Sequence, residues 1–107
     1  MNKLVRLLLI LGILLSACSM PLLAQDSPAI YKTKCAACHG PDGKGDTAVG
    51  KKLGVRDFAS PEVQKQSDDE LAAIINDGKN KMPAYKKSLK PEEVKALVAF
   101  IHAFGKK

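Results

Sequence analysis

The sequence predicts an all-α domain with long loops, and three observations lead to this fold class. A capping box at Ser67–Glu70 opens a stretch with apolar residues at helical spacing, which Gly78 closes. The stretch from Pro91 to Phe104 places its large apolar residues on one face: Val94, Leu97, Val98, Ile101 and Phe104. No window shows the sustained alternation of apolar and polar residues that is typical of strands.

The N-terminal segment has the pattern of an export signal. Lys3 and Arg6 precede an apolar run from Leu7 to Leu15, and small residues follow this run. These are the basic, apolar and cleavage regions of a secretory signal. Residues 7–24 carry no charge and approach membrane-spanning length. Pro21 and the small residues argue against a retained membrane anchor.

Two cleavage sites compete within this signal. Cleavage after Ala24 makes residues 1–24 the signal peptide and residues 25–107 the mature domain, although Leu22 fits imperfectly the preference for small residues before the cut. Alternatively, Leu15-Ser16-Ala17-Cys18 resembles the lipobox of bacterial lipoproteins, with residues 1–17 removed and Cys18 lipidated. The lipobox explains the cysteine that stands apart from the other two. At either site, we expect export to the bacterial periplasm, as a soluble or a lipid-anchored protein.

The mature domain is mildly basic. The chain has 17 basic and 11 acidic residues, and removal of the signal with Lys3 and Arg6 leaves a formal net charge of +4. This charge suits docking on acidic protein surfaces. Export, an aromatic content of 5% and the absence of a basic helix motif exclude nucleic acid as a partner. We expect a monomer.

The domain begins with a predicted helix from Ser27 to about Cys38, with Ser27 as N-cap and Pro28 as first helical residue. Residues 40–46 contain three glycines and a proline, which predicts a loop. Its glycines are expected to let the backbone pass close to a flat ligand, or to form an ordinary surface turn. A short helical turn is predicted from Ser60 to about Gln66. The last helix lacks a good N-cap, since Lys90 costs about 1 kcal/mol relative to Ser or Thr.

The motif Cys35-Ala36-Ala37-Cys38-His39 is the attachment signature of a c-type haem. Residues i and i+3 lie on one face of a helix, so both thiols can form thioethers with one side of a porphyrin. The next residue, His39, supplies a nitrogen ligand for the iron. A thiol-redox or zinc module on the same cysteines is the alternative, but it lacks a second cysteine pair.

Met82 is the predicted second iron ligand. It is the one methionine of the mature domain that lies beyond the signal region, and it stands between two predicted helices beside Pro83. A thioether ligand favours reduced iron and raises the potential, which suits an electron carrier. His102 is the rival ligand. It falls beside Lys95 on the flank of the last helix that faces away from the apolar residues, so we expect a solvent-side histidine.

Taken together, these motifs resemble the small single-haem class I c-type cytochromes of the bacterial periplasm. The resemblance covers residues 27–104 and includes Gly40 after the haem motif, Pro41-Asp42-Gly43-Lys44-Gly45 and Lys81-Met82-Pro83-Ala84-Tyr85. It implies three to five helices wrapped around one covalently attached haem c. The first and last helices would cross, through Ile30 or Tyr31 and through Leu97, Phe100 or Ile101. It also implies thioethers at Cys35 and Cys38, His39 as proximal ligand, Met82 as distal ligand and Tyr85 near a propionate.

The expected function is one-electron transfer between redox partner proteins, as a free carrier or as a subunit of a larger oxidoreductase, and without enzymatic activity of its own. Lysines near Met82 and after the haem motif are expected to surround the haem edge and to steer acidic partners: Lys79, Lys81, Lys86, Lys87, Lys44, Lys51 and Lys52. The alternative is a haem protein with five-coordinate iron that binds or senses a ligand, which requires that Met82 not bind.

Overall fold

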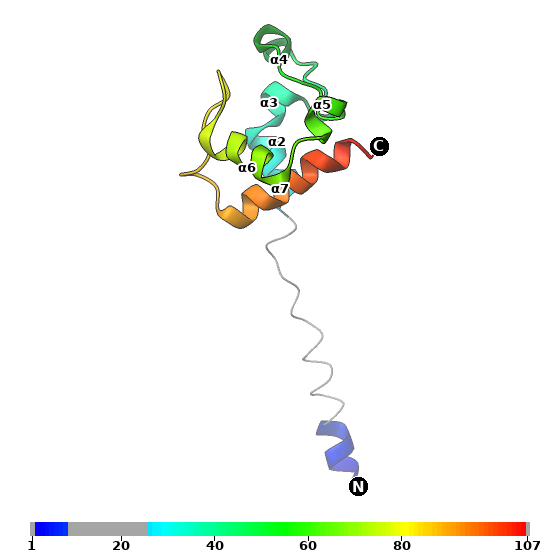
Figure 1. Cartoon of the computed structure of the whole chain (residues 1–107). Coiled ribbons are helices and arrows are strands. Elements are labelled where there is room, and N and C mark those ends of the chain that lie inside the picture. Colours follow the sequence, from blue (N-terminus) through cyan, green and yellow to red (C-terminus); the bar gives the residue numbers. More distant parts are fainter. Residues whose placement is uncertain (1, 9–25, 107) are drawn as a thin grey trace.

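Short helices joined by long loops form the domain (Figure 1). The computed structural model describes residues 2–8 and 26–106. Residues 3–8 form a helical segment that precedes the domain. The domain helices are α2 (Ser27–Lys34), α3 (Ala36–His39), α4 (Ala48–Leu53), α5 (Pro61–Gln64), α6 (Asp68–Asp77) and α7 (Pro91–Phe104). No strand occurs among the described residues, which confirms the all-α class. Cys18 and both predicted cleavage sites lie outside the described residues.

The helix predicted from Ser27 to about Cys38 is interrupted. Asp26 is the N-cap of α2, in place of the predicted Ser27, and α2 ends before Cys35. The Cys35 N–H still donates to the Tyr31 carbonyl at 2.9 Å, whereas the Cys38 N–H donates to the Cys35 carbonyl at 3.3 Å. The haem motif therefore begins at a helix break, which sets the direction of α3 separately from that of α2.

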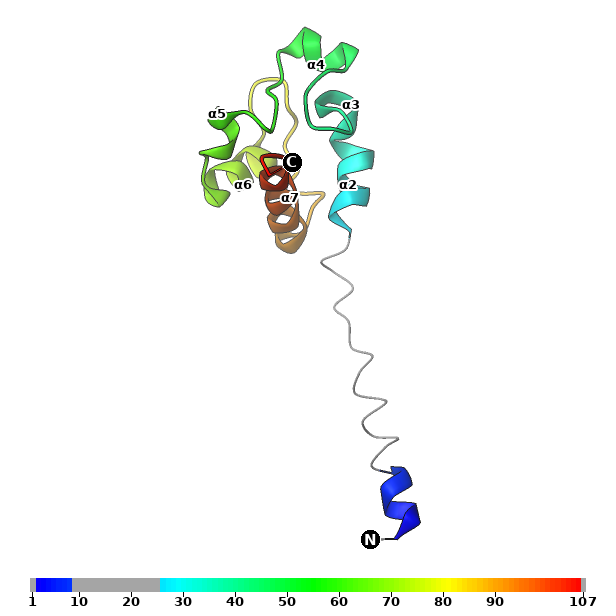
Figure 2. The ribbon, with the colours of Figure 1, turned by 90° about the vertical axis from the view of Figure 1, so that its right-hand side faces the viewer.

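Helix α7 forms the centre of the core, with α6 on one side and α2 on the other (Figure 2). The Tyr31 ring of α2 lies 4.9 Å from Phe100 and 5.8 Å from Phe104, measured between ring centroids. The predicted contact between first and last helices is thus confirmed through Tyr31 and Phe100. The buried core consists of Tyr31, Phe58, Val63, Leu71, Ile75, Leu89, Val94, Leu97, Val98, Ile101 and Phe104.

The caps of α6 and α7 differ as their sequences suggest. In α6, the Glu70 N–H donates to Ser67 Oγ and the Ser67 N–H donates to Glu70 Oε2, both at 3.1 Å, which confirms the capping box. In α7, the Lys90 N–H donates to Glu93 Oε1 at 2.9 Å, but the Lys90 side chain has no acceptor to offer in return. The start of α7 therefore keeps one half of a capping box.

Helix α4 was not predicted, because Gly50 lies in the middle of this short stretch. The Gly50 N–H donates to Thr47 Oγ1, and the Thr47 hydroxyl donates to the Cys38 carbonyl, both at 2.8 Å. Gly54 ends the helix with φ +67°. The threonine cap thus links α4 directly to the haem motif.

None of the helices in the described part of the chain has the length and apolar character that a membrane span requires.

Candidate haem site

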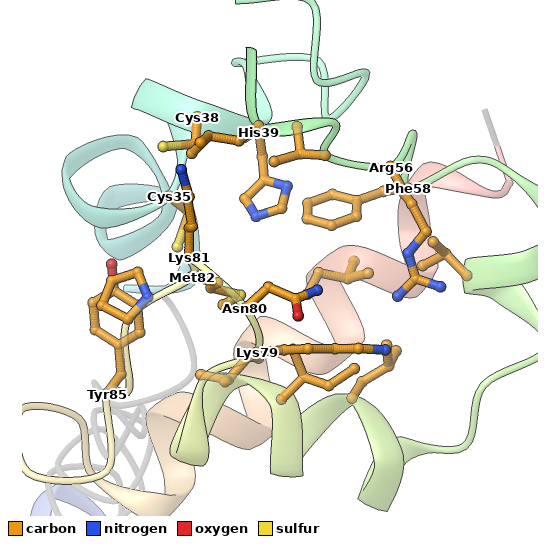
Figure 3. A pocket seen from close by; sticks show the side chains of 18 of the residues that line it. Cys35, Cys38, His39, Arg56, Phe58, Lys79, Asn80, Lys81, Met82 and Tyr85 are labelled. Carbon is orange, nitrogen blue, oxygen red and sulfur yellow. The ribbon is translucent and has the colours of Figure 1, made fainter. Parts of the chain in front are cut away.

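A cavity of about 380 Å³ lies between α3, the segment 53–58, α6 and the loop that follows α6 (Figure 3). All four predicted site residues line it: Cys35, Cys38, His39 and Met82. In Figure 3, His39 enters from α3, and the loop with Met82 passes on another side of the cavity. Leu71, Ile74 and Ile75 of α6 supply an apolar wall. His39 and Met82, which are 43 residues apart in the sequence, thus meet at one cavity.

The His39 side chain is half-buried and makes no hydrogen bond to the described residues. Its ring stacks on Phe58, with 4.5 Å between centroids and 23° between planes. Its Nδ1 atom is buried without a hydrogen-bond partner in this part of the chain. Burial lowers the pKa of the imidazole, so the ring is neutral near pH 7. A neutral imidazole whose ring nitrogen has no hydrogen-bond partner can serve as a metal ligand.

Both cysteines are partly buried free thiols on the cavity wall. Burial raises the pKa of the Cys35 thiol, and the nearby Cys38 adds to this effect while Lys34 opposes it. Cys35 lies at the break between α2 and α3, and Cys38 lies within α3. The helix break therefore replaces the continuous helical face that the spacing alone predicted.

Met82 is presented by a tight turn that follows α6. The Lys79 N–H donates to the Met82 carbonyl at 3.2 Å, and the Met82 N–H donates to the Lys79 carbonyl at 3.0 Å. The turn requires positive φ values at two residues, which are +75° at Gly78 and +55° at Asn80. The Met82 side chain is partly buried and packs against the core. The turn therefore directs Met82 inward from an otherwise exposed loop.

His102 does not line this cavity. Its Nε2 atom lies 3.1 Å from Asp68 Oδ1, and a quarter of its side chain is exposed. The histidine thus joins the end of α7 to the start of α6 and is less exposed than predicted. The structure brings Met82, and not His102, to the cavity that contains His39.

The residues present fit a covalently attached haem. Two thiols, one neutral imidazole and one thioether converge on a cavity with an apolar wall. Imidazole and thioether are the iron ligands of cytochromes c, and paired thiols are the attachment points of haem c.

Comparisons with known proteins identify the family of this chain. Residues 23–101 match the family described as cytochrome c oxidase, cbb3-type, subunit III. A cytochrome c6 of Nostoc sp. is 36% identical over 99 residues, which cover 88% of this chain and 86% of the relative. This chain belongs to the small class I c-type cytochromes. As a member of this family, it is an electron-transfer protein.

Two further relatives of this cytochrome differ in length. The solved structure of the KustC0563 c-type cytochrome has a TM-score of 0.69 and 43% identity, and the match covers 74% of this chain and 96% of that one. The cbb3-type cytochrome c oxidase subunit CcoP of Azospirillum brasilense is 30% identical over 84 residues. The match covers 77% of this chain but 28% of CcoP. The chain thus matches small c-type cytochromes over most of their length and 28% of the longer oxidase subunit.

The cavity of this cytochrome has a basic lining. Lys34, Arg56, Lys79 and Lys81 line it, and none of its lining residues is acidic. Sequence reasoning named Lys79 and Lys81, but it missed Lys34 and Arg56. The five other predicted lysines, at positions 44, 51, 52, 86 and 87, do not line the cavity. The position of Lys34 directly before Cys35 is the sequence signal that could have placed it at the cavity.

The glycine-rich loop 40–46 does not line the cavity either, so the expected close approach to a flat ligand is not seen. A Cβ atom on Gly43 would lie 3.0 Å from the Phe58 ring and 3.2 Å from the Phe104 ring. The glycine therefore permits tight packing of the loop on aromatic side chains, one of which stacks on His39.

Proposed function

We propose that this cytochrome is a periplasmic carrier of single electrons, with one haem c attached at Cys35 and Cys38 and ligated by His39 and Met82. The convergence of these four side chains on one cavity supports the proposal. When bound, the haem supplies an iron that alternates between the ferrous and ferric states. In this proposal, the protein carries electrons and performs no substrate chemistry of its own.

His39 and Met82 are the side chains that would hold the iron. His39 is kept neutral by burial and is fixed by its stacking on Phe58. The Met82 thioether is a soft ligand that favours the reduced state. With His39 and Met82 both bound, an external ligand would have to displace one of them. Electron transfer would then be favoured, because neither side chain would have to leave when the charge of the iron changes.

The basic cavity lining supports acidic docking surfaces on the redox partners. Lys34, Arg56, Lys79 and Lys81 place positive charge at the cavity, where the haem edge would face a partner. Such steering weakens as salt screens the charges.

The match to oxidase subunits CcoP and FixP leaves two roles open for a monomer of this kind: a free carrier, or a subunit of a larger oxidoreductase. Lipidation at Cys18 would keep either form at a membrane.

The absorption spectrum of the mature holoprotein tests the ligand set. We expect a weak band near the red end of the oxidised spectrum, which reports sulfur bound to iron. Met82→Ala should abolish this band, whereas His102→Ala should keep it, because His102 pairs with Asp68 away from the cavity. A wild-type protein that lacks the band and binds carbon monoxide when reduced would instead be the five-coordinate alternative. Intact mass gives the number of haems and the state of Cys18.

Charge reversal tests the docking surface. Arg56→Glu should slow electron transfer to an acidic partner and reduce its dependence on ionic strength. Lys95→Glu is the matched control, because Lys95 is exposed on α7 and does not line the cavity. Equal rates for both variants would contradict docking at the cavity.

A further inference from the structure

Tyr85 joins the two sides of the haem site. Its hydroxyl donates a hydrogen bond to the Lys34 carbonyl at 3.1 Å, across 51 residues of sequence. Lys34 directly precedes Cys35, and Tyr85 follows Met82 by three residues. One hydrogen bond thus connects the segment that carries the haem thiols to the segment that carries the predicted distal ligand. Figure 3 shows Tyr85 below Cys35, beside the cavity.

The helix break explains why the Lys34 carbonyl can accept this bond. In an unbroken helix, the Cys38 N–H would donate to Lys34. Here α2 ends at Lys34, and the Cys38 N–H donates to Cys35. The last carbonyls of a helix need partners from elsewhere. The Tyr85 hydroxyl therefore caps α2 at the point where the haem motif begins.

The methionine loop has a second anchor on α6. The Tyr85 N–H donates to the Ile75 carbonyl at 2.9 Å, and the Lys86 N–H donates to the Asn76 carbonyl at 3.1 Å. These bonds hold the end of the loop to α6, but they do not reach the cysteine side. Among hydrogen bonds between described residues, the Tyr85 hydroxyl alone links the segment 79–85 to the segment 34–39.

We propose that Tyr85 is a positioning residue that keeps Met82 at the haem site by tying the methionine loop to the end of α2. This inference rests on the proposed ligation by Met82. Without the hydroxyl, the loop stays anchored to α6 but can move away from the cysteine side. Met82 then leaves its position more often, and an external ligand competes with it more effectively. Loss of one such hydrogen bond corresponds to about a twofold to tenfold change in this equilibrium.

The test compares the wild-type holoprotein with Tyr85→Phe, which removes a single O–H and keeps the ring. Carbon monoxide is titrated into the reduced protein, where it competes with Met82. We expect its affinity to rise about twofold to tenfold in Tyr85→Phe. Amide hydrogen exchange at Met82, whose N–H bonds to the Lys79 carbonyl, should also become faster. This second measurement reports loop opening independently of the added ligand.

Tyr31→Phe is the matched control. The Tyr31 hydroxyl also donates to a backbone carbonyl, that of Gly40 at 2.6 Å, but it lies in the core beside the His39 segment. Its loss should reduce overall stability and leave carbon monoxide affinity unchanged. An equal rise in both variants would overturn the positioning role, because general loosening of the fold would then explain the effect.

The spectrum separates this inference from the proposed function. If the oxidised wild type lacks the sulfur-to-iron band, Met82 is not a ligand, and the role of Tyr85 falls with it. If the wild type has the band but Tyr85→Phe shows unchanged affinity and exchange, only the role of Tyr85 is overturned. A band in the wild type, together with raised affinity in Tyr85→Phe alone, supports both.

Discussion

Replacement of Gly78 by alanine should release the methionine turn. Gly78 has φ +75° and ψ 170°, a conformation that glycine adopts and other residues avoid. The backbone strain in alanine is about 1–3 kcal/mol. A Cβ atom would also lie 2.6 Å from the Met82 carbonyl oxygen, the acceptor of the Lys79 N–H. Such crowding adds about 1–3 kcal/mol, so the total loss of unfolding free energy should be about 2–6 kcal/mol.

Gly54→Ala separates the two contributions. Gly54 has φ +67° and ψ 37°, and a Cβ atom there meets no other atom within 4 Å. This variant should lose about 1–2 kcal/mol from the left-handed backbone alone. Guanidinium unfolding of both holoproteins measures the difference, and the sulfur-to-iron band reports the position of Met82. Equal losses, with the band intact in Gly78→Ala, would refute crowding at the Met82 carbonyl.

Three further variants test the core and its hydrogen bonds. Leu97→Ala removes a side chain that is 1% exposed and should cost about 2–5 kcal/mol in guanidinium unfolding. Gln64→Leu leaves the carbonyls of Phe58 and Ile101 without their donor and should cost about 1–3 kcal/mol in the same assay. Burial, with smaller contributions from Cys35 and Asp42, raises the pKa of the Tyr31 phenol. As the pH rises, the unfolded chain loses the phenol proton at a lower pH than the folded protein does. The free energy of unfolding therefore falls above about pH 10. In Tyr31→Phe, the free energy of unfolding should decline less steeply with rising pH. A decline equal to that of the wild type would show that the Tyr31 phenol is not its cause.

Local sequence signals were sufficient where a helix end is determined by neighbouring residues. The capping box of Ser67 and Glu70 and the apolar face of α7 both appear as predicted. The same signals failed at Cys35, because the spacing of the haem motif is compatible with either a continuous or a broken helix. They also failed at α4, where Gly50 lowers helix propensity and contact with the Cys38 carbonyl through Thr47 compensates.

The sequence by itself determined the chemistry of this protein: two thiols and an imidazole within five residues, one methionine in a distant loop, and helices enough to enclose a small cavity. Tertiary structure decided which of these groups meet. Met82 reaches the cavity and His102 does not, because the turn after Gly78 directs one inward and Asp68 holds the other. The bond from Tyr85 to Lys34 spans 51 residues, so no local pattern could predict it. Contacts between residues so far apart in the sequence form only when the helices of residues 26–106 have packed around α7.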